Sequence, residues 1–254
     1  MKWSWLLLVL LAACANTETD SDRTVAGSGQ EEEAEASAAE PVSAGEPVAE
    51  SEEPAESETP SSASPLDGSR SDEWRVLFGG DSLDGWEVTS FGGEGEVRVR
   101  EGGVRFGVGS PLTGIHYTGE ELPVTDYEIS LTATRVQGSD FFCGLTFPVE
   151  ESHCTLVLGG WGGALCGLSC IDGKDAADND TMKIFGFENG RAYRVRLRVT
   201  GDRIRAWLDD ELLVDQDVTG KELSLRPEVS ASVPLGVSAF VTIAEFRDIR
   251  IRRL

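Results

Sequence analysis

The chain has 254 residues and a formal net charge of −23, with 45 acidic side chains against 22 basic ones. So acidic a protein is repelled by a phosphate backbone, which argues against nucleic acid as a partner. The charge is also uneven along the sequence, and it separates the chain into three segments.

The first segment, residues 1–14, has the features of a bacterial export signal. Lys2 gives it a positive start, an uninterrupted apolar run covers 6–11, and two alanines precede Cys14. The apolar run is too short to cross a bilayer as a helix. The small residues before Cys14 resemble a lipobox, in which this cysteine is acylated. We expect a lipid-anchored cell-envelope protein, with Ala15 favouring the outer membrane, and keep an ordinary cleaved signal as the alternative.

The second segment, residues 15–70, carries 15 acidic and 2 basic side chains, a net charge of −13. It consists mainly of Glu, Ala, Ser and Pro and cannot bury enough apolar surface to offset the entropy lost on ordering. We expect a disordered acidic linker that holds the rest of the chain away from the membrane.

The third segment, residues 71–254, is long enough for one domain and alternates apolar with polar side chains between turn residues. The clearest hairpin turns at Gly201 and Asp202, which suit a two-residue loop. That loop places Arg196 opposite Trp207, where a cation–π contact is expected.

A second hairpin is expected over 141–158, with its loop at 148–151 and with Phe141 on the inner face and Phe142 on the outer face. The other expected strands are 74–78, 96–100, 104–108, 127–136, 181–187, 235–241 and 245–253. No segment has a helical period, and the chain contains 29 glycines. This pattern predicts an all-β fold, an antiparallel β-sandwich of the jelly-roll type.

Four cysteines lie in this segment, which is an even number in a chain expected to be exported. No histidine stands at zinc-site spacing from them. Cys154 could pair with Cys166 or Cys170, or all four, including Cys143, could be free buried cysteines. The sequence leaves these alternatives open.

One stretch of the third segment resembles the opening of a known family. Residues 77–87 read L-F-G-G-D-S-L-D-G-W-E, and 126–129 and 246–251 add further landmarks in the same order. The chain resembles the 3-keto-disaccharide hydrolase domain family over about 73–254, although Gly79 replaces a usual Asn. A Cys- and Gly-rich block at 141–170 stands where other members have an Arg-rich segment, which indicates a non-typical branch.

The resemblance implies a concanavalin A-like sandwich that acts on or binds glycosides. In the family, a 3-keto group acidifies the neighbouring C2 proton, so that cleavage needs a base and a group that holds the enolate charge. Whether this chain is catalytic is left open. The alternatives are a non-catalytic glycan-binding module and a purely structural envelope module.

Several residues are candidates for such a site. Trp161, between two glycine pairs, is a candidate to stack on a sugar ring; the alternative is that its ring folds back over the edge of the sandwich. His153, on the polar side of its strand, is a candidate general base, and Glu188 a second candidate catalytic group. Asp172 and Asn189 are candidate ligand-binding residues.

The loop 172–180 is rich in oxygen donors. Asp175, Asp178 and Asp180 are candidate ligands for Ca²⁺ or another divalent cation, although the loop does not match the Asp-x-Asp-x-Asp-Gly calcium loop. The alternative is an acidic surface loop without a metal. We expect a monomer whose partners are a carbohydrate or glycoside ligand and, through the lipid anchor, a membrane.

Overall fold

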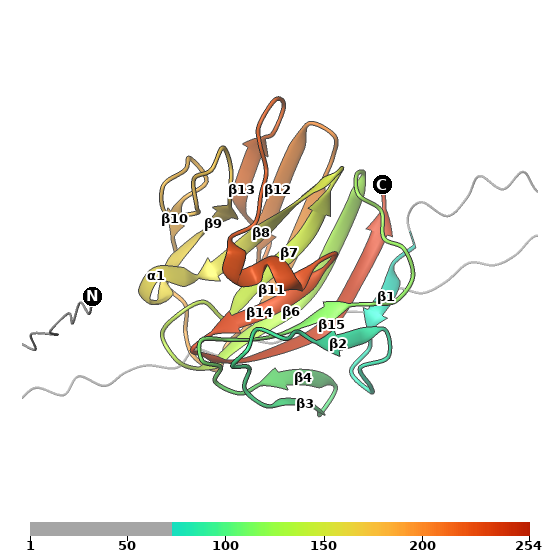
Figure 1. Cartoon of the computed structure of the whole chain (residues 1–254), viewed down its shortest axis with the longest axis vertical. Helices are drawn as coiled ribbons and strands as arrows, with labels where there is room; N and C mark the ends of the chain where they lie inside the picture. Colours follow the sequence, from blue (N-terminus) through green and yellow to red (C-terminus); the bar gives the residue numbers. More distant parts are fainter. Residues whose placement is uncertain (1–72) are drawn as a thin grey trace, which may run out of the picture. The chain divides into compact units, whose positions relative to one another are not determined.

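The structure, a computed structural model, describes residues 73–254; the expected export signal and acidic linker lie outside the described residues. Within 73–254 the chain forms two antiparallel β-sheets, labelled here sheet A and sheet B (Figure 1). Apolar side chains from both sheets form one core between them. The predicted all-β antiparallel sandwich is therefore confirmed.

Sheet A contains eight strands, seven of them in one edge-to-edge order. That order is β13 (Glu211–Asp217), β12 (Arg203–Leu208), β11 (Ala192–Val199), β6 (Tyr127–Gln137), β15 (Ile243–Arg253), β4 (Gly103–Phe106) and β3 (Val97–Arg100). The eighth strand, β1 (Arg75–Phe78), pairs with a later part of β15 than β4 does.

Sheet B contains seven strands, and two short helical segments lie next to its strands in the chain. The strand order is β10 (Lys183–Ile184), β9 (Leu165–Ser169), β8 (Ser152–Gly159), β7 (Cys143–Val149), β14 (Gly236–Phe240), β5 (Leu112–Tyr117) and β2 (Trp86–Val88). The segments are α1 (Gly160–Gly163), between β8 and β9, and the 3₁₀ segment η1 (Pro227–Ser232), before β14. Within 73–254, no helix has the length and hydropathy needed to cross a bilayer.

The hairpin of β11 and β12 forms in the predicted register. Val199 lies opposite Ile204, and Arg196 lies opposite Trp207. The Arg196 guanidinium carbon lies 4.1 Å from the centroid of the Trp207 ring, which confirms the expected cation–π contact. Apolar positions of these strands face the core and the arginines between them face outward.

The hairpin of β7 and β8 differs from the prediction in register. Val149 pairs with Ser152, so the loop contains only two residues, Glu150 and Glu151. Because the shift is an even number of residues, the inner and outer faces of the strands are unchanged. The expected faces of Phe141 and Phe142 are wrong, because regular pairing begins only at Cys143 and the chain bends before it.

All four cysteines of the domain are free and buried. Burial raises the pKa of the Cys154 thiol to about 12 and that of Cys166 to about 11. They are therefore uncharged and pack as small apolar side chains at neutral pH. In the register of β8 and β9, Cys166 lies opposite Leu158 rather than opposite Cys154.

A buried hydrogen bond joins the two sheets. The Tyr127 hydroxyl, on β6 of sheet A, donates to the Pro148 carbonyl on β7 of sheet B at 2.5 Å. We predict that Tyr127→Phe lowers the free energy of unfolding by about 1–3 kcal/mol, because the Pro148 carbonyl loses its buried partner.

Urea unfolding measures this difference. Tyr117→Phe is the control, because its buried ring packs on Trp86 while its hydroxyl hydrogen-bonds no group among residues 73–254. Equal losses in both variants would contradict a role for the bond between the sheets.

Candidate functional site

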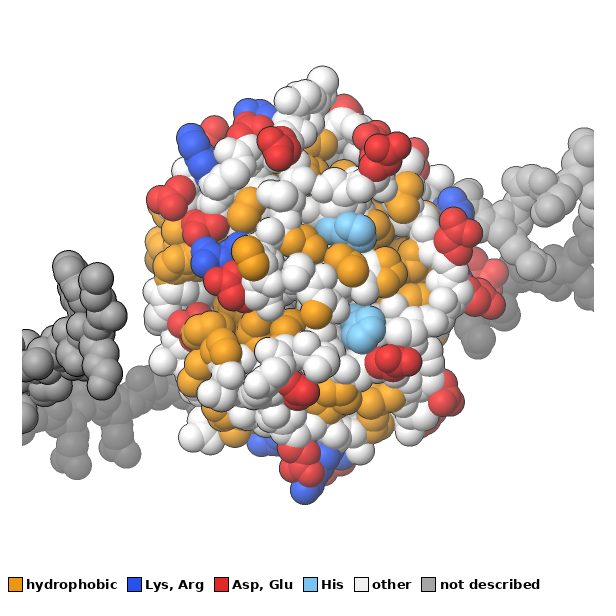
Figure 2. Space-filling view, in the orientation of Figure 1, with side chains coloured by type: hydrophobic (Ala, Val, Ile, Leu, Met, Phe, Trp, Pro, Cys, Tyr) orange, Lys and Arg blue, Asp and Glu red, His pale blue; other side chains and the backbone are white. Residues whose placement is uncertain are grey.

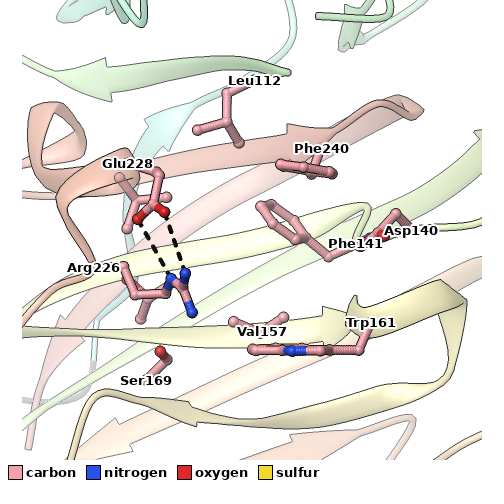
Figure 3. A pocket seen from close by; sticks show the side chains of 11 residues that line it. Leu112, Asp140, Phe141, Val157, Trp161, Ser169, Arg226, Glu228 and Phe240 are labelled. Carbon is pink, nitrogen blue, oxygen red and sulfur yellow. Dashed lines mark hydrogen bonds and ion pairs between the residues drawn. The ribbon is translucent and has the colours of Figure 1, made fainter. Parts of the chain in front are cut away.

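A hollow of about 230 Å³ opens on the outer face of sheet B, next to the turn that carries Trp161. Residues of β5, β8, β9 and β14, of α1 and of the start of η1 line it. Figure 2 shows that apolar side chains and both histidines of the chain appear on this face of the molecule. Figure 3 shows the lining side chains, with Trp161 on one side and Arg226 on the other.

The floor of the hollow consists of side chains that point outward from sheet B. On β8, Leu156 belongs to the core, whereas its neighbours Thr155 and Val157 line the hollow. Ser169 of β9 lies directly opposite Thr155 and adds a second hydroxyl. The floor therefore offers both apolar contact and hydrogen-bonding groups.

Two phenylalanines form one wall. The ring centroids of Phe141 and Phe240 lie 5.6 Å apart. The Phe141 ring lies over Gly144 of β7, where a Cβ would approach its Cε2 atom to 3.1 Å. Glycine at position 144 thus leaves room for the ring to settle against the sheet. Phe142, in contrast, is buried and packs against Phe187 at 4.9 Å between centroids.

Trp161 stands on the tight turn α1 with its side chain 47% exposed. Its backbone is left-handed, with φ 48° and ψ 51°, a conformation that costs a bulky residue about 1–3 kcal/mol. The indole is not part of the hydrophobic core. Its ring borders the hollow beside Val157 (Figure 3).

A buried arginine of the other sheet holds this turn in place. Arg135 of β6 is 7% exposed. Its guanidinium donates to the Gly163 carbonyl at 2.9 Å, to the Phe187 carbonyl at 2.6 Å and to Asn189 Oδ1 at 2.7 Å. Gly163 has φ 107°, and a Cβ there would lie 2.9 Å from the Arg135 guanidinium, so that only glycine permits this approach.

The wall opposite Trp161 is charged. Arg226 donates to Asp175 Oδ2 at 2.7 Å and to Glu228 Oε1 at 3.2 Å. The hydrogen bond from Arg226 lowers the pKa of Glu228, which is therefore ionised at neutral pH. With Asp140 also lining the hollow, carboxylates outnumber cations around it. The site accepts hydrogen bonds more readily than it donates them.

The two histidines lie on the same face but do not line the hollow. His153 projects from the outer face of β8, two residues before Thr155, and pairs across the hairpin with Pro148. Burial lowers the pKa of His153, so its ring is neutral at pH 7. His116 Nδ1 lies 3.2 Å from the Thr89 hydroxyl.

The acidic loop reaches the hollow only through Asp175. Asp172 instead accepts from Lys221 at 2.8 Å, and this bond lowers the pKa of Asp172. Asp178 and Asp180 are exposed. Among residues 73–254, no three His, Cys, Asp or Glu side chains converge to hold a metal ion. The loop's carboxylates thus do not fit the predicted Ca²⁺ site.

Glu188 and Asn189 do not line the hollow. The Glu188 side chain is exposed, and its backbone N–H donates to the Tyr193 hydroxyl at 2.8 Å. Asn189 accepts from Arg135 and donates to the Gly138 carbonyl at 3.3 Å. Its side chain supports the turn that bears Trp161.

Sequence reasoning missed Arg226, Glu228 and the two phenylalanines of the wall. Arg226 is 65 residues beyond Trp161, and no local pattern marks the segment before η1. The predicted face of Phe141 is wrong, because the alternation of inward and outward side chains, counted back from Cys143, does not reveal the bend before β7. Of the predicted site residues, the structure brings Trp161 and Asp175 to the hollow or to its charged wall.

We predict that Arg135→Met lowers the free energy of unfolding by about 2–6 kcal/mol, because two buried carbonyls lose their donors. Hydrogen–deuterium exchange should rise at 159–165 in particular. Arg191→Met serves as the control, since Arg191 stacks on Tyr193 from the surface and its ion pair is exposed. Unchanged exchange at 159–165 in Arg135→Met would contradict this anchoring role.

Since burial lowers the pKa of His153, the folded protein binds its proton less readily than the unfolded chain. His153 thus contributes stability that is present above its unfolded pKa, about 6.5, and is lost as pH falls through its folded pKa. A proton NMR titration should give an apparent pKa below 6.5 for this ring. His153→Gln should flatten the stability profile between pH 7 and 5, and an unaltered profile would refute the assignment.

Several solved structures are similar to this chain in fold. A Crh5 transglycosylase solved with NAG matches 72% of this chain and 85% of its own, at 10% identity and a TM-score of 0.50. The carbohydrate-binding module CBM66 from Bacillus subtilis covers 66% and 95%, at 14% identity and a TM-score of 0.46. A non-specific endo-β-1,3(4)-glucanase of family GH16 covers 72% and 92%, at 9% identity and a TM-score of 0.47. These likenesses concern the fold alone.

Comparison with curated proteins gives no match. A family model, in contrast, matches residues 73–252, which is all but the last two of the described residues. The matched family is described as the 3-keto-alpha-glucoside-1,2-lyase-like domain. The resemblance seen in the opening stretch at 77–87 is thereby confirmed. The chain belongs to this family.

Proposed function

We propose that the chain is a cell-envelope lipoprotein whose sandwich binds neutral glycosides in the hollow beside Trp161. The observation that carries this proposal is the half-exposed indole on a turn anchored by Arg135. An aromatic ring held at the rim of a hollow offers a flat apolar surface to the C–H face of a sugar ring. Holding the ring beforehand reduces the entropy lost on binding.

The rest of the lining complements a sugar's hydroxyl groups. The hydroxyls of Thr155 and Ser169 already contact Thr146 Oγ1 at 3.0 Å and Cys170 Sγ at 3.4 Å, and each keeps further hydrogen-bonding capacity. The carboxylates of Glu228 and Asp140 accept hydrogen bonds. The carboxylates of Glu228 and Asp175 already engage the guanidinium of Arg226, so little positive charge is left for an acidic sugar. Neutral sugars are therefore preferred to uronic acids at this site.

Family membership supports a second function, cleavage of 3-keto glycosides in the same hollow. Proton abstraction beside the keto group needs a base within hydrogen-bond reach of the substrate. Two carboxylates line the hollow, those of Glu228 and Asp140. The bond from Arg226 keeps Glu228 ionised, but by lowering its pKa it also weakens Glu228 as a base. His153 remains a candidate base only for a substrate that extends beyond the hollow along β8.

Trp161→Ala should weaken binding of a neutral disaccharide such as cellobiose by about tenfold or more, because a buried aromatic contact is worth about 2 kcal/mol. Isothermal titration calorimetry measures the change. Met182→Ala is the matched control, since Met182 is also 47% exposed and lies outside the hollow. If Trp161→Ala and the unaltered chain bind the disaccharide with equal affinity, the proposal is contradicted.

Turnover is tested by incubating the protein with 3-keto-disaccharides and with their unoxidised parents, followed by mass spectrometry. Cleavage of only the keto sugar would establish the enzymatic function. Glu228→Gln and His153→Ala then separate the two candidate bases. Binding without cleavage in any condition leaves the binding module as the function.

The lipid anchor rests on the sequence around Cys14. Mass spectrometry of the mature protein from a bacterial host should find acyl chains on Cys14 at the new N-terminus. Cys14→Ala should release the protein from the membrane fraction. A soluble mature protein that begins elsewhere would contradict the anchor.

A further inference from the structure

A buried carboxylate surrounded by three arginines lies on the outer face of sheet A, on the other side of the sandwich from the hollow. Glu128 of β6 pairs in register with Arg198 of β11 on one side and with Arg252 of β15 on the other. Arg196, two residues before Arg198, points to the same face. We call Arg196, Arg198, Arg252 and Glu128 the arginine cluster.

The contacts within the arginine cluster leave most of the guanidinium donors free. Arg198 Nε donates to Glu128 Oε1 at 2.8 Å, and Arg252 Nε donates to Oε2 at 2.8 Å, with a second bond from the same guanidinium. Arg196 Nη1 lies 3.6 Å from Oε1, beyond ordinary hydrogen-bond distance. Each guanidinium has five N–H donors, so many remain for a ligand.

The arginine cluster has more positive charge than Glu128 can neutralise. Three guanidinium groups face one carboxylate, which leaves a surplus of two positive charges. Neighbouring arginines of the same sheet pair with exposed acids; Arg203 and Arg205, for example, both contact Asp215. The surplus is local, because residues 71–254 contain 30 acidic and 19 basic side chains.

Only positive groups of the arginine cluster are accessible from outside. The Glu128 side chain is 0% exposed, whereas those of Arg196, Arg198 and Arg252 are 38%, 32% and 24% exposed. Two indole rings flank them. The guanidinium of Arg196 lies 4.1 Å from the Trp207 centroid, and that of Arg252 lies 4.8 Å from the Trp74 centroid.

Stacking and the buried carboxylate fix the orientation of these guanidinium groups before any ligand arrives. Fixed, forked donors suit the two oxygens of a carboxylate or a sulfate. The surrounding indoles add apolar surface of the kind that contacts a sugar ring. The net negative charge of the domain opposes close approach to an anionic bilayer, which favours a soluble ligand over a lipid surface.

We propose that the arginine cluster is a second binding site, which takes the acidic group of an anionic saccharide such as a uronic acid. This site is separate from the hollow and does not depend on its function. Because the contacts are ionic, binding should weaken as salt rises from about 20 to 300 mM.

The test titrates the full chain with tetragalacturonate and, separately, with the neutral cellotetraose. Arg196→Gln should weaken tetragalacturonate binding by about tenfold, the effect of losing one charge-assisted hydrogen bond. It should leave cellotetraose binding unchanged. Arg196 is the residue to alter because its guanidinium lies beyond hydrogen-bond distance of Glu128, so its loss leaves the hydrogen bonds of that carboxylate intact.

Two further variants keep the result unambiguous. Glu128→Gln removes the buried negative charge and should strengthen tetragalacturonate binding by about threefold or more, with a thermal melt to verify folding. Arg100→Gln, on the edge strand β3, is the charge-matched control and should change nothing.

The proposal is overturned if wild type shows no saturable binding of tetragalacturonate. Equal losses in Arg196→Gln and Arg100→Gln would also overturn it, since they would indicate a general charge effect. Binding to phosphatidylglycerol vesicles but not to tetragalacturonate would refute the saccharide assignment.

Discussion

The position of the candidate site depends on Arg135, a buried guanidinium that forms no ion pair with any carboxylate of residues 73–254. Arg135 projects from sheet A and donates hydrogen bonds to two backbone carbonyls. One belongs to Gly163, in the turn between β8 and β9, and the other to Phe187, in the loop after β10. A buried charge is tolerated only where its donors are used, and here three backbone or amide oxygens use them. The hydrogen bonds thus fix both the turn that bears Trp161 and the loop that follows β10.

This arrangement explains why a strained, exposed tryptophan is stable at its position. The left-handed backbone of Trp161 costs energy, but the adjacent Gly163 is locked against Arg135 and the turn cannot relax freely. The indole therefore remains at the rim of the hollow. Phe141 and Phe240 complete the apolar wall, and Arg226 holds the two carboxylates on the opposite side.

The two outer faces of the sandwich have opposite chemistry. The hollow on sheet B has more carboxylates than cations around it, whereas the arginine cluster on sheet A presents a positive surplus over a hidden Glu128. Burial alone would raise the pKa of Glu128, but the hydrogen bonds from Arg252 and Arg198 outweigh it and lower that pKa. The carboxylate is thus charged at neutral pH and keeps the guanidinium groups ordered.

Local patterns predicted the parts of the fold that local physics determines. Alternation and the Gly201-Asp202 turn gave the register of β11 and β12, including the stacking of Arg196 on Trp207. The alternation of inward and outward side chains gave the wrong face for Phe141, because a bend before β7 turns Phe142 into the core and Phe141 outward.

The charged wall of the hollow could not be predicted from the sequence, for a different reason. Arg226 reaches the hollow only through the tertiary path of the segment before η1, which no nearby residue pattern encodes. Asn189 is a comparable case: its amide suggested a ligand-binding residue, but its bond to Arg135 is visible only in three dimensions. Strand β5 was also missed, since its short run is interrupted by Gly114 and pairs with strands distant in sequence.

The most direct test of the central claim follows the indole N–H signals by NMR while a neutral disaccharide is added. The Trp161 signal should move saturably. The Trp86 signal should stay in place, because its indole donates to the Leu77 carbonyl inside the core at 2.8 Å. A Trp161 signal that does not move at saturating sugar, or that moves no more than the Trp86 signal, would contradict the account of the hollow as the glycoside site.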